Sequence, residues 1–227
     1  MNVSIHQPQY IPWFPYINKI IESNLFILLD SVDFQKNGLQ NRNKIKSVQG
    51  ASWLTIPVRQ NLGQKIIDVE IDNTQHWRRK HWTTILQNYQ KAAAFSRYAE
   101  ELESIYLQDW TRLVDINIAV LQLLLKWFKI DVFVRQSSQM KAAGKSSELL
   151  LNLCQEVHAT TYISGIGAKA YLDESGFADA GIQIIYKPPV LPRHYPQQHP
   201  KAGFLNDLSS LDFILNCGDD WKNYIEG

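Results

Sequence analysis

Three polar side chains stand where the first two apolar runs of the chain end. His6 and Gln7 follow the strand-like run "NVSI", and Asp30 follows the continuous apolar run "LFILL". An imidazole can take up a proton near neutral pH, which suits a general base in catalysis. We therefore identify His6, Gln7 and Asp30 as candidate catalytic residues, with His6 as the base.

The connection between these two runs is rigid and aromatic. Pro8, Pro12 and Pro15 fix the backbone and supply no amide donors, so the loop cannot form the phosphate cradle of a glycine-rich loop. Tyr10 and Trp13 supply aromatic rings that can stack on a base or on a sugar. The alternative interpretation is a stiff corner whose aromatic residues belong to the core.

Two basic segments carry groups that can hold phosphate. In "HWRRKHW", Lys80 and His81 form one candidate pair, while His76 and His81 are five residues apart and lack the spacing of a helical metal pair. We therefore expect no metal. The other segment, "NGLQNRNKIK", is predicted to be a turn that is either a phosphate site or simply solvated. Its candidate substrate-binding residues are Asn41, Arg42, Asn43 and Lys44.

A glycine-containing turn follows a late apolar run. In "TYISGIGAKAYLDE", Ser164, Gly165 and Gly167 lie between a predicted strand and a predicted helix, where backbone amides can face an anion or an acyl carbonyl. The spacing matches neither the dinucleotide fingerprint nor the P-loop, so the cofactor stays unknown. The remaining candidate substrate-binding residues are Gln35, Ser137 and Tyr171.

The elements that position these residues follow an α/β pattern. A strand ending at His6, a helix and a strand ending before Asp30 form one βαβ unit, and the runs "DVFVRQ", "SSELLLNLCQEV", "TTYISG" and "GIQIIYK" form a second half. We predict one α/β domain over residues 1–227, with a mainly parallel sheet and a helical insertion at about 73–128. The proline-rich stretch "KPPVLPRHYPQQHPKAGF" is expected to be an extended surface loop. Ligands gather beyond the carboxyl ends of parallel strands.

Composition narrows the class of protein. Hydrophobic residues make up 45% of the chain and the net charge is +1, which favours a globular protein without a general attraction to nucleic acid. Polar residues interrupt the apolar segment 113–130, so we expect no membrane span. The two cysteines match no metal or redox spacing, and no signal peptide is evident, so we expect a cytoplasmic protein.

The sequence resembles the WbqC-like family. The resemblance rests on "IHQPQYIPWFPYINKI", "NRNKIK", "WLTIPV", "TYISGIGAKAYLDE" and "LDFILNCG", which occur in this order between His6 and Gly218. Family members often have glycine before the tyrosine at position 16, where this chain has Pro15. The resemblance implies a role in bacterial surface-polysaccharide (O-antigen) biosynthesis and assigns no catalytic residue.

The resemblance therefore leads us to expect a transferase that modifies a nucleotide-linked amino sugar by acyl or aminoacyl transfer. A nucleotidylyl-transferase-like enzyme of the HIGH type stays open, because a first strand ending in histidine fits that architecture, although its full motif is missing. A non-catalytic sugar-nucleotide binder or assembly protein also stays open. The expected partner is a small molecule, and the sequence leaves a homo-oligomer open.

Overall fold

The computed structural model describes residues 1–225 of the chain. Their contacts form two compact units, each assembled from three separate stretches. Unit 1 consists of Met1–Gln7, Asn18–Val32 and Asp131–Pro189, and unit 2 of Pro8–Ile17, Asp33–Ile130 and the described residues from Val190 onward. The single domain expected from the sequence stays a prediction.

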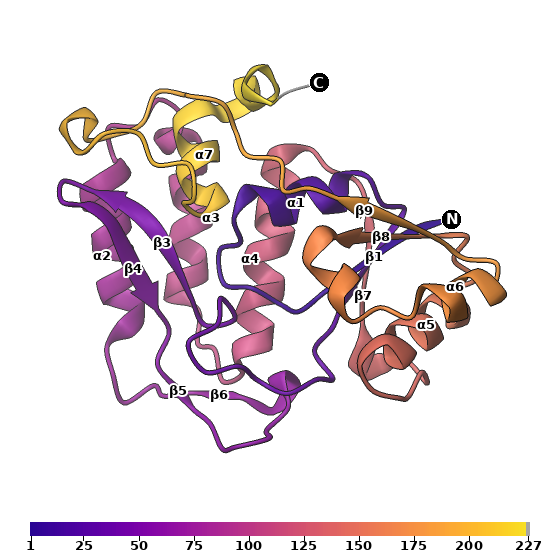
Figure 1. Ribbon diagram of the computed structural model, residues 1–227. Coiled ribbons are helices and arrows are strands. Elements are labelled where there is room, and N and C mark those ends of the chain that lie inside the picture. The colour runs from indigo at the N-terminus through magenta and orange to yellow at the C-terminus, as the bar shows by residue number, and fades with distance from the viewer. Residues whose placement is uncertain (226–227) are drawn as a thin grey trace. The chain divides into compact units, whose positions relative to one another are not determined.

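Unit 1 contains a five-stranded, all-parallel sheet in the order β7-β2-β1-β8-β9 (Figure 1). This confirms the predicted α/β class and its mainly parallel sheet. The chain moves outward from β1 to β2 and β7, then returns to place β8 on the other side of β1. The switch point of this doubly wound sheet therefore lies between β1 and β8. The strands are β1 (Asn2–His6), β2 (Leu25–Leu28), β7 (Phe133–Gln136), β8 (Thr161–Gly165) and β9 (Gln183–Lys187).

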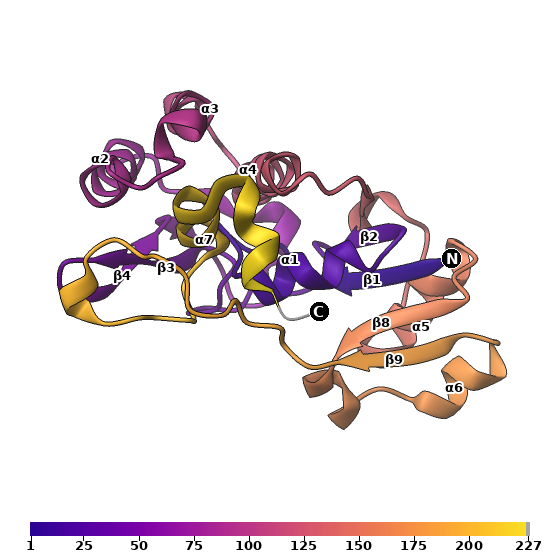
Figure 2. The same cartoon turned by 90° about the horizontal axis from the view of Figure 1, so that it is seen from above.

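Alternation along β1 sends its side chains to opposite faces of this sheet. Val3 and Ile5 belong to a buried cluster with apolar residues of α5 (Ser146–Glu156) and α6 (Glu174–Asp179), which lie on one side of the sheet in Figure 2. Ser4 points to the other face, where its hydroxyl accepts a hydrogen bond of 2.7 Å from Ser23. The apolar side chains of β1 are thus buried on the sheet face that packs against α5 and α6, while its polar side chains lie on the opposite face.

Unit 2 combines helices with two short antiparallel hairpins. The helices α2 (Trp77–Tyr89), α3 (Phe95–Leu107) and α4 (Leu113–Phe128) lie within the segment predicted to be a helical insertion. Most of α4 is apolar and buried, as a core helix requires. No helix within residues 1–225 is long and apolar enough to cross a membrane. The other elements are α7 (Ser210–Cys217) and the hairpins β3 (Arg42–Ser47) with β4 (Gly50–Thr55), and β5 (Val58–Arg59) with β6 (Glu70–Ile71); α1 (Phe14–Ile21) has residues in both units.

One local expectation is wrong, and another needs an addition. The polar stretch from Arg42 to Ser47, predicted to be a turn, is strand β3, because it pairs with β4 along its whole length. The proline-rich stretch is mostly an irregular, exposed or half-exposed loop, as expected, but it is anchored by Tyr195, which is only 3% exposed. Its hydroxyl donates a 2.8 Å hydrogen bond to Asp212, a buried carboxyl group on α7.

Asp212 is the centre of a buried polar network in unit 2. Its carboxyl oxygens accept hydrogen bonds from the hydroxyls of Tyr89 at 2.7 Å and Tyr195 at 2.8 Å, and from the Gln197 amide at 3.1 Å. The Gln197 carbonyl in turn accepts a 2.9 Å hydrogen bond from Lys46, which is 1% exposed. Burial raises the pKa of Asp212, and these donors oppose that rise. The network therefore fixes the proline-rich stretch by charge and hydrogen bonding.

Candidate functional site

The predicted site residues are distributed over both units. Those in unit 1 cluster at or just beyond the carboxyl ends of the parallel strands, as predicted for a ligand-binding edge. They are His6, Gln7, Asp30, Ser137, Ser164, Gly165, Gly167 and Tyr171. Those in unit 2 are Tyr10, Trp13, Gln35, Asn41, Arg42, Asn43, Lys44, Lys80 and His81.

The pairing between β1 and β8 stops short of the carboxyl ends of both strands. Their last paired residues are Ser4 and Ile163, yet β1 stays paired with β2 through His6, and β8 stays paired with β9 through Gly165. The two central strands thus lack mutual pairing over their last two residues, while each keeps its outer neighbour. We call this place, at the switch point, the β1–β8 split; it is where a doubly wound sheet receives a ligand.

Lys19 occupies the β1–β8 split. Successive carbonyl groups of a strand point to opposite neighbours, and the His6 carbonyl binds Leu29 on the β2 side. The Ile5 carbonyl therefore points toward β8, and it accepts a 3.2 Å hydrogen bond from the Lys19 ammonium. Sequence reasoning missed Lys19, although a lysine on the apolar helix after the first strand is a signal that could have identified it.

The titratable groups at the split are both perturbed. Burial lowers the pKa of Lys19 to about 7, so about half of the lysine is a neutral amine at that pH. Burial, with repulsion by Lys19, lowers the pKa of His6 to about 3, far from the near-neutral value expected from its residue type. His6 Nδ1 lies 3.1 Å from the Gln7 carbonyl, which can only accept, so Nδ1 carries the proton and Nε2 is the unprotonated nitrogen.

Asp30 joins the carboxyl ends of β2 and β7. Its carboxylate is completely buried and accepts four hydrogen bonds of 2.8–3.0 Å, from the hydroxyls of Ser137 and Ser138, the Ser138 amide and the Gln136 side chain. The Ser137 hydroxyl also accepts a hydrogen bond from the Asp30 amide. With its oxygens occupied in this way, Asp30 is built to hold two strand ends together, and Ser137 is part of the same clamp.

Replacing Asp30 with alanine is expected to lower the free energy of unfolding by about 2–3 kcal/mol, because it leaves several buried donors without an acceptor. Urea denaturation of the wild type and the variant measures the change. The exposed Asp179 provides a control, for which Asp179→Ala is expected to change stability by less than about 0.5 kcal/mol. A loss for Asp30→Ala as small as that of the control would rule out the clamp.

The turn after β8 has room at its surface. Ser164 is 2% exposed and lies on the α5–α6 face with Tyr162, so its hydroxyl belongs to the core. A Cβ at Gly165 or Gly167 would meet no atom within 4 Å, and neither glycine has a positive φ. Among the described glycines only these two combine both properties. Neither backbone conformation nor internal packing therefore requires glycine at these two positions.

In unit 2, the predicted polar side chains near Asn43 are structural. Asn43 is 2% exposed, and its amide donates to the carbonyls of Ile11 at 2.9 Å and Tyr10 at 3.4 Å. Ile11 has a φ of 39°, which is a strained value for a β-branched residue. Asn43 therefore holds in place the strained loop that follows β1. The Asn41 amide likewise donates to the Ile56 carbonyl at 2.8 Å. These side chains are occupied and buried, which argues against direct ligand contact.

His81 is the end of a buried chain of hydrogen bonds. Its Nε2 lies 3.1 Å from the Thr55 carbonyl and so carries the proton, which leaves Nδ1 to accept at 3.0 Å from the Tyr10 hydroxyl. The Tyr106 hydroxyl then donates to the Tyr10 oxygen at 2.7 Å. Burial lowers the pKa of His81 to about 4. Tyr10 is 0% exposed, so it cannot provide the predicted stacking surface.

A cavity of about 540 Å³ lies between β4 and the first turns of α2. Lys80 and His81, both predicted as substrate-binding residues, line it, together with Trp53 and Trp77. The Arg42 guanidinium carbon is 4.6 Å and the Lys44 ammonium 5.8 Å from the centre of the Trp53 ring. Lys44 also forms an ion pair with Asp207.

The two remaining predicted residues of unit 2 do not line this cavity. Gln35 is exposed, and Trp13 is partly exposed and forms an isolated β-bridge with Ser209.

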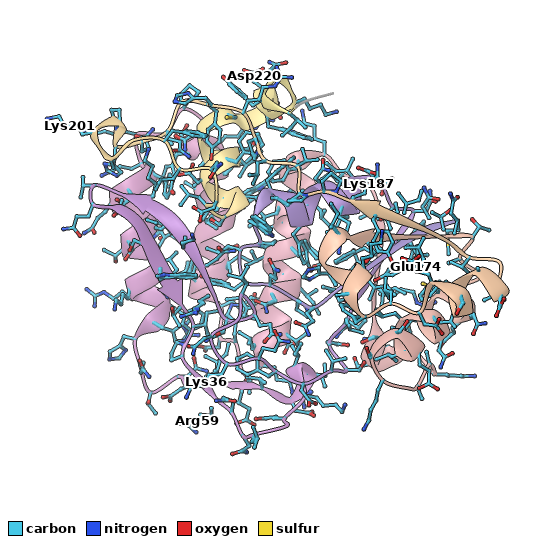
Figure 3. All side chains as sticks on the ribbon, in the orientation of Figure 1. Lys36, Arg59, Glu174, Lys187, Lys201 and Asp220 are labelled. Carbon is cyan, nitrogen blue, oxygen red and sulfur yellow. The ribbon has the colours of Figure 1, made fainter. Side chains whose placement is uncertain are left out.

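Within residues 1–225 there is no group of three or more His, Cys, Asp or Glu side chains placed to hold a metal ion. At the far edge of the sheet in unit 1, Lys187, at the carboxyl end of β9 (Figure 3), forms a 2.7 Å ion pair with Glu22. At the β1–β8 split itself, the pKa values of both Lys19 and His6 are lowered.

The fold and this site define an α/β protein with a doubly wound parallel sheet and a candidate ligand site at its switch point. The chain belongs to the WbqC-like protein family, whose family model matches residues 7–224. It is 34% identical over 226 residues to the protein named "Uncharacterized protein Rv1507c" of Mycobacterium tuberculosis (strain ATCC 25618 / H37Rv), a match that covers 98% of this chain and 96% of that protein. No solved structure matches the chain.

Proposed function

We propose that this protein is a transferase of bacterial surface-polysaccharide biosynthesis that adds a small acyl or aminoacyl group to the amino group of a nucleotide-linked sugar. The β1–β8 split carries the proposal, because it combines an opened switch point with a lysine that is partly neutral near pH 7. We infer the pathway from what membership of the WbqC-like family implies. His6, Gln7 and the turn with Gly165 and Gly167 contribute to the same site.

In the proposed reaction, the sugar amine attacks the carbonyl carbon of an activated ester or thioester. A nitrogen–carbon bond forms, and the bond from that carbon to the donor's oxygen or sulfur breaks. The neutral amine of Lys19 takes the proton released by the attacking nitrogen and returns it to the departing alcohol or thiol. The half-buried His6, neutral at physiological pH, serves as a hydrogen-bonding and orienting group, which replaces the role of base expected from the sequence.

Deletion of the gene tests the pathway and the reaction together. Sugar analysis of the surface polysaccharide is expected to show loss of one N-acyl or N-aminoacyl substituent, and the unmodified nucleotide sugar is expected to accumulate. Complementation with the wild type should restore the substituent, whereas the Lys19→Met variant should not. A polysaccharide with an unchanged composition after deletion would refute the proposed function.

The two glycines of the turn provide a sharper test of the site. Gly165 has φ −75° and ψ 152°, values that alanine adopts freely, so Gly165→Ala is expected to raise the free energy of unfolding by about 0.4–1 kcal/mol. The added methyl group is expected to raise KM for the nucleotide sugar at least about tenfold, by occupying space left for the ligand. Denaturation and steady-state kinetics measure both changes. Ala170→Gly, on the same turn, is the control and should leave KM unchanged.

A nucleotidylyl-transferase-like enzyme is the second candidate, and the sheet order favours it. If the five strands of the parallel sheet are numbered by their order in the sequence, their order across the sheet is 3-2-1-4-5. Doubly wound nucleotide-binding sheets share this order. The first strand ends in His6. A nucleoside triphosphate with magnesium should then raise the melting temperature. Absence of any such rise across the four triphosphates would remove this candidate.

A further inference from the structure

The cavity between β4 and α2 has the chemistry of a binding site for an anion. Its lining includes the ammonium-bearing Lys80 and the hydroxyls of Thr55 and Thr84, and none of the described lining residues is a carboxylate. Thr84 donates its hydroxyl hydrogen to the Lys80 carbonyl at 2.7 Å, which holds the side chain in place on α2. The volume of about 540 Å³ falls within the range of small-molecule sites.

One wall of this cavity is the free edge of a strand. Among the described residues β4 pairs only with β3, and the Thr55 carbonyl points away from β3 because it accepts a hydrogen bond from His81 on α2. Residues two apart along a strand direct their peptide groups the same way. The N–H and C=O groups of Trp53 therefore also point away from β3, toward the cavity that Trp53 lines.

Trp53 gives this wall an exposed aromatic ring. The side chain is among the exposed large hydrophobic residues, at 46% relative exposure. Arg42 and Lys44 lie near the ring, at 4.6 and 5.8 Å from its centre, so cation–π contacts help to hold the ring in place. An aromatic ring beside a lysine and hydroxyls suits a ligand with an apolar C–H face, several hydroxyls and a negative charge.

We propose that the β4–α2 cavity binds a phosphorylated sugar, with Lys80 on the phosphate and Trp53 against the sugar ring. The inference rests on the proposed function in that both involve a sugar phosphate, and it assigns that ligand to a cavity formed entirely by unit 2. The buried His81 acts as a positioning residue, because its hydrogen bond to Thr55 ties α2 to the strand edge. The phosphoryl group comes either from a free sugar phosphate or from a nucleotide sugar.

Tryptophan indole signals report on this cavity. All seven tryptophans of the chain lie in unit 2, so in the full-length protein labelled with ¹⁵N-tryptophan none of the indole signals comes from unit 1. Trp53→Phe identifies the Trp53 signal. Titration with glucose 1-phosphate or UDP-glucose is expected to shift it, whereas glucose and inorganic phosphate alone should bind at least about tenfold more weakly. Shifts with both ligands, or with UDP-glucose alone, support the proposal and identify the source of the phosphate.

Variants of α2 complete the test. Lys80→Gln is expected to weaken binding about tenfold, as loss of a charge-assisted hydrogen bond predicts, while the neighbouring exposed Arg79→Gln serves as the matched control and should stay within about twofold of the wild type. An unmoved Trp53 signal, equal affinity for inorganic phosphate, or a Lys80→Gln variant that binds like the wild type would overturn the proposal. Lys19→Met should leave the indole shifts intact, because Lys19 lies in unit 1. A wild-type protein that shows the indole shifts but transfers no acyl or aminoacyl group would count against the proposed function alone.

Discussion

Asp212→Ala is expected to lower the free energy of unfolding by about 3–5 kcal/mol. The substitution removes the acceptor of three hydrogen bonds from Tyr89, Tyr195 and Gln197, all partly or fully buried. It also leaves the ammonium of Lys46, a residue only 1% exposed, without the charge that favours its protonated form. Burying a charge without compensation costs more than losing a surface ion pair, which accounts for the size of the effect.

Urea denaturation followed by tryptophan fluorescence measures this loss, since the tryptophans lie in the same unit as Asp212. The double variant Asp212→Leu with Lys46→Met is expected to recover part of the stability, because it removes both buried charges together. Limited proteolysis should also cut the proline-rich stretch sooner in Asp212→Ala than in the wild type. Unchanged stability and unchanged proteolysis would show that the network does not anchor the stretch.

Lys19→Met is expected to lower kcat/KM by about 10²–10⁴-fold, the contribution of a general base, while leaving the protein folded. A base acts in its neutral form, and the pKa of Lys19 is lowered to about 7. In the wild type, kcat/KM should therefore rise with pH through about 7 and level off above it. His6, with a pKa of about 3, stays neutral through this pH range and cannot produce that rise of kcat/KM with pH.

The pH profile separates a catalytic from a structural role of Lys19. The matched control is Lys187→Met, because Lys187 is also a lysine near this edge, at the carboxyl end of β9. This variant should keep both the activity and the rise of kcat/KM near pH 7. In the Lys19→Met variant the residual activity should no longer depend on pH in this range. A wild-type profile that is flat through pH 7 would show that Lys19 is not the base, whatever activity the variant retains.

Stability provides a readout of Lys19 that needs no substrate. Its folded-state pKa of about 7 lies below the ordinary value of 10.5, so between these values the unfolded chain binds more protons than the folded one. The free energy of unfolding contributed by this group therefore rises with pH from about 7 to about 10.5. Lys19→Met removes this slope and should stabilise the protein more at pH 6 than at pH 10.

Much of the sheet was predictable because its signals are local. Continuous or alternating apolar runs of strand length, each separated by helical spacing, identify β1, β2, β8 and β9 without reference to the rest of the chain. The polar residues that follow those runs also mark the carboxyl edge, which is how His6, Asp30 and Gly165 were found. What each of them does was harder to predict, because function depends on partners that are distant in sequence.

The features that sequence reasoning missed have the same cause. Arg42 to Ser47 is too polar to read as a strand, yet pairing with β4 satisfies its backbone. The proline-rich stretch contains no local sign that Tyr195 is buried, since its partner Asp212 lies on a later helix. Asn43 was identified as a surface ligand group because the sequence does not show the Ile11 carbonyl that its amide binds.

The sequence by itself determined the α/β class, the family and the edge at which polar side chains collect, because periodicity and residue order are properties of short stretches. Only the tertiary structure decided that the pairing of β1 with β8 ends at Ser4 and Ile163, that the Lys19 ammonium binds the Ile5 carbonyl just beyond, and that Asp30 is a saturated clamp. Strand separation, desolvation and hydrogen-bond occupancy arise between residues that the fold brings together. They set which side chain can move a proton, and for that reason composition and spacing identify the edge but not the base.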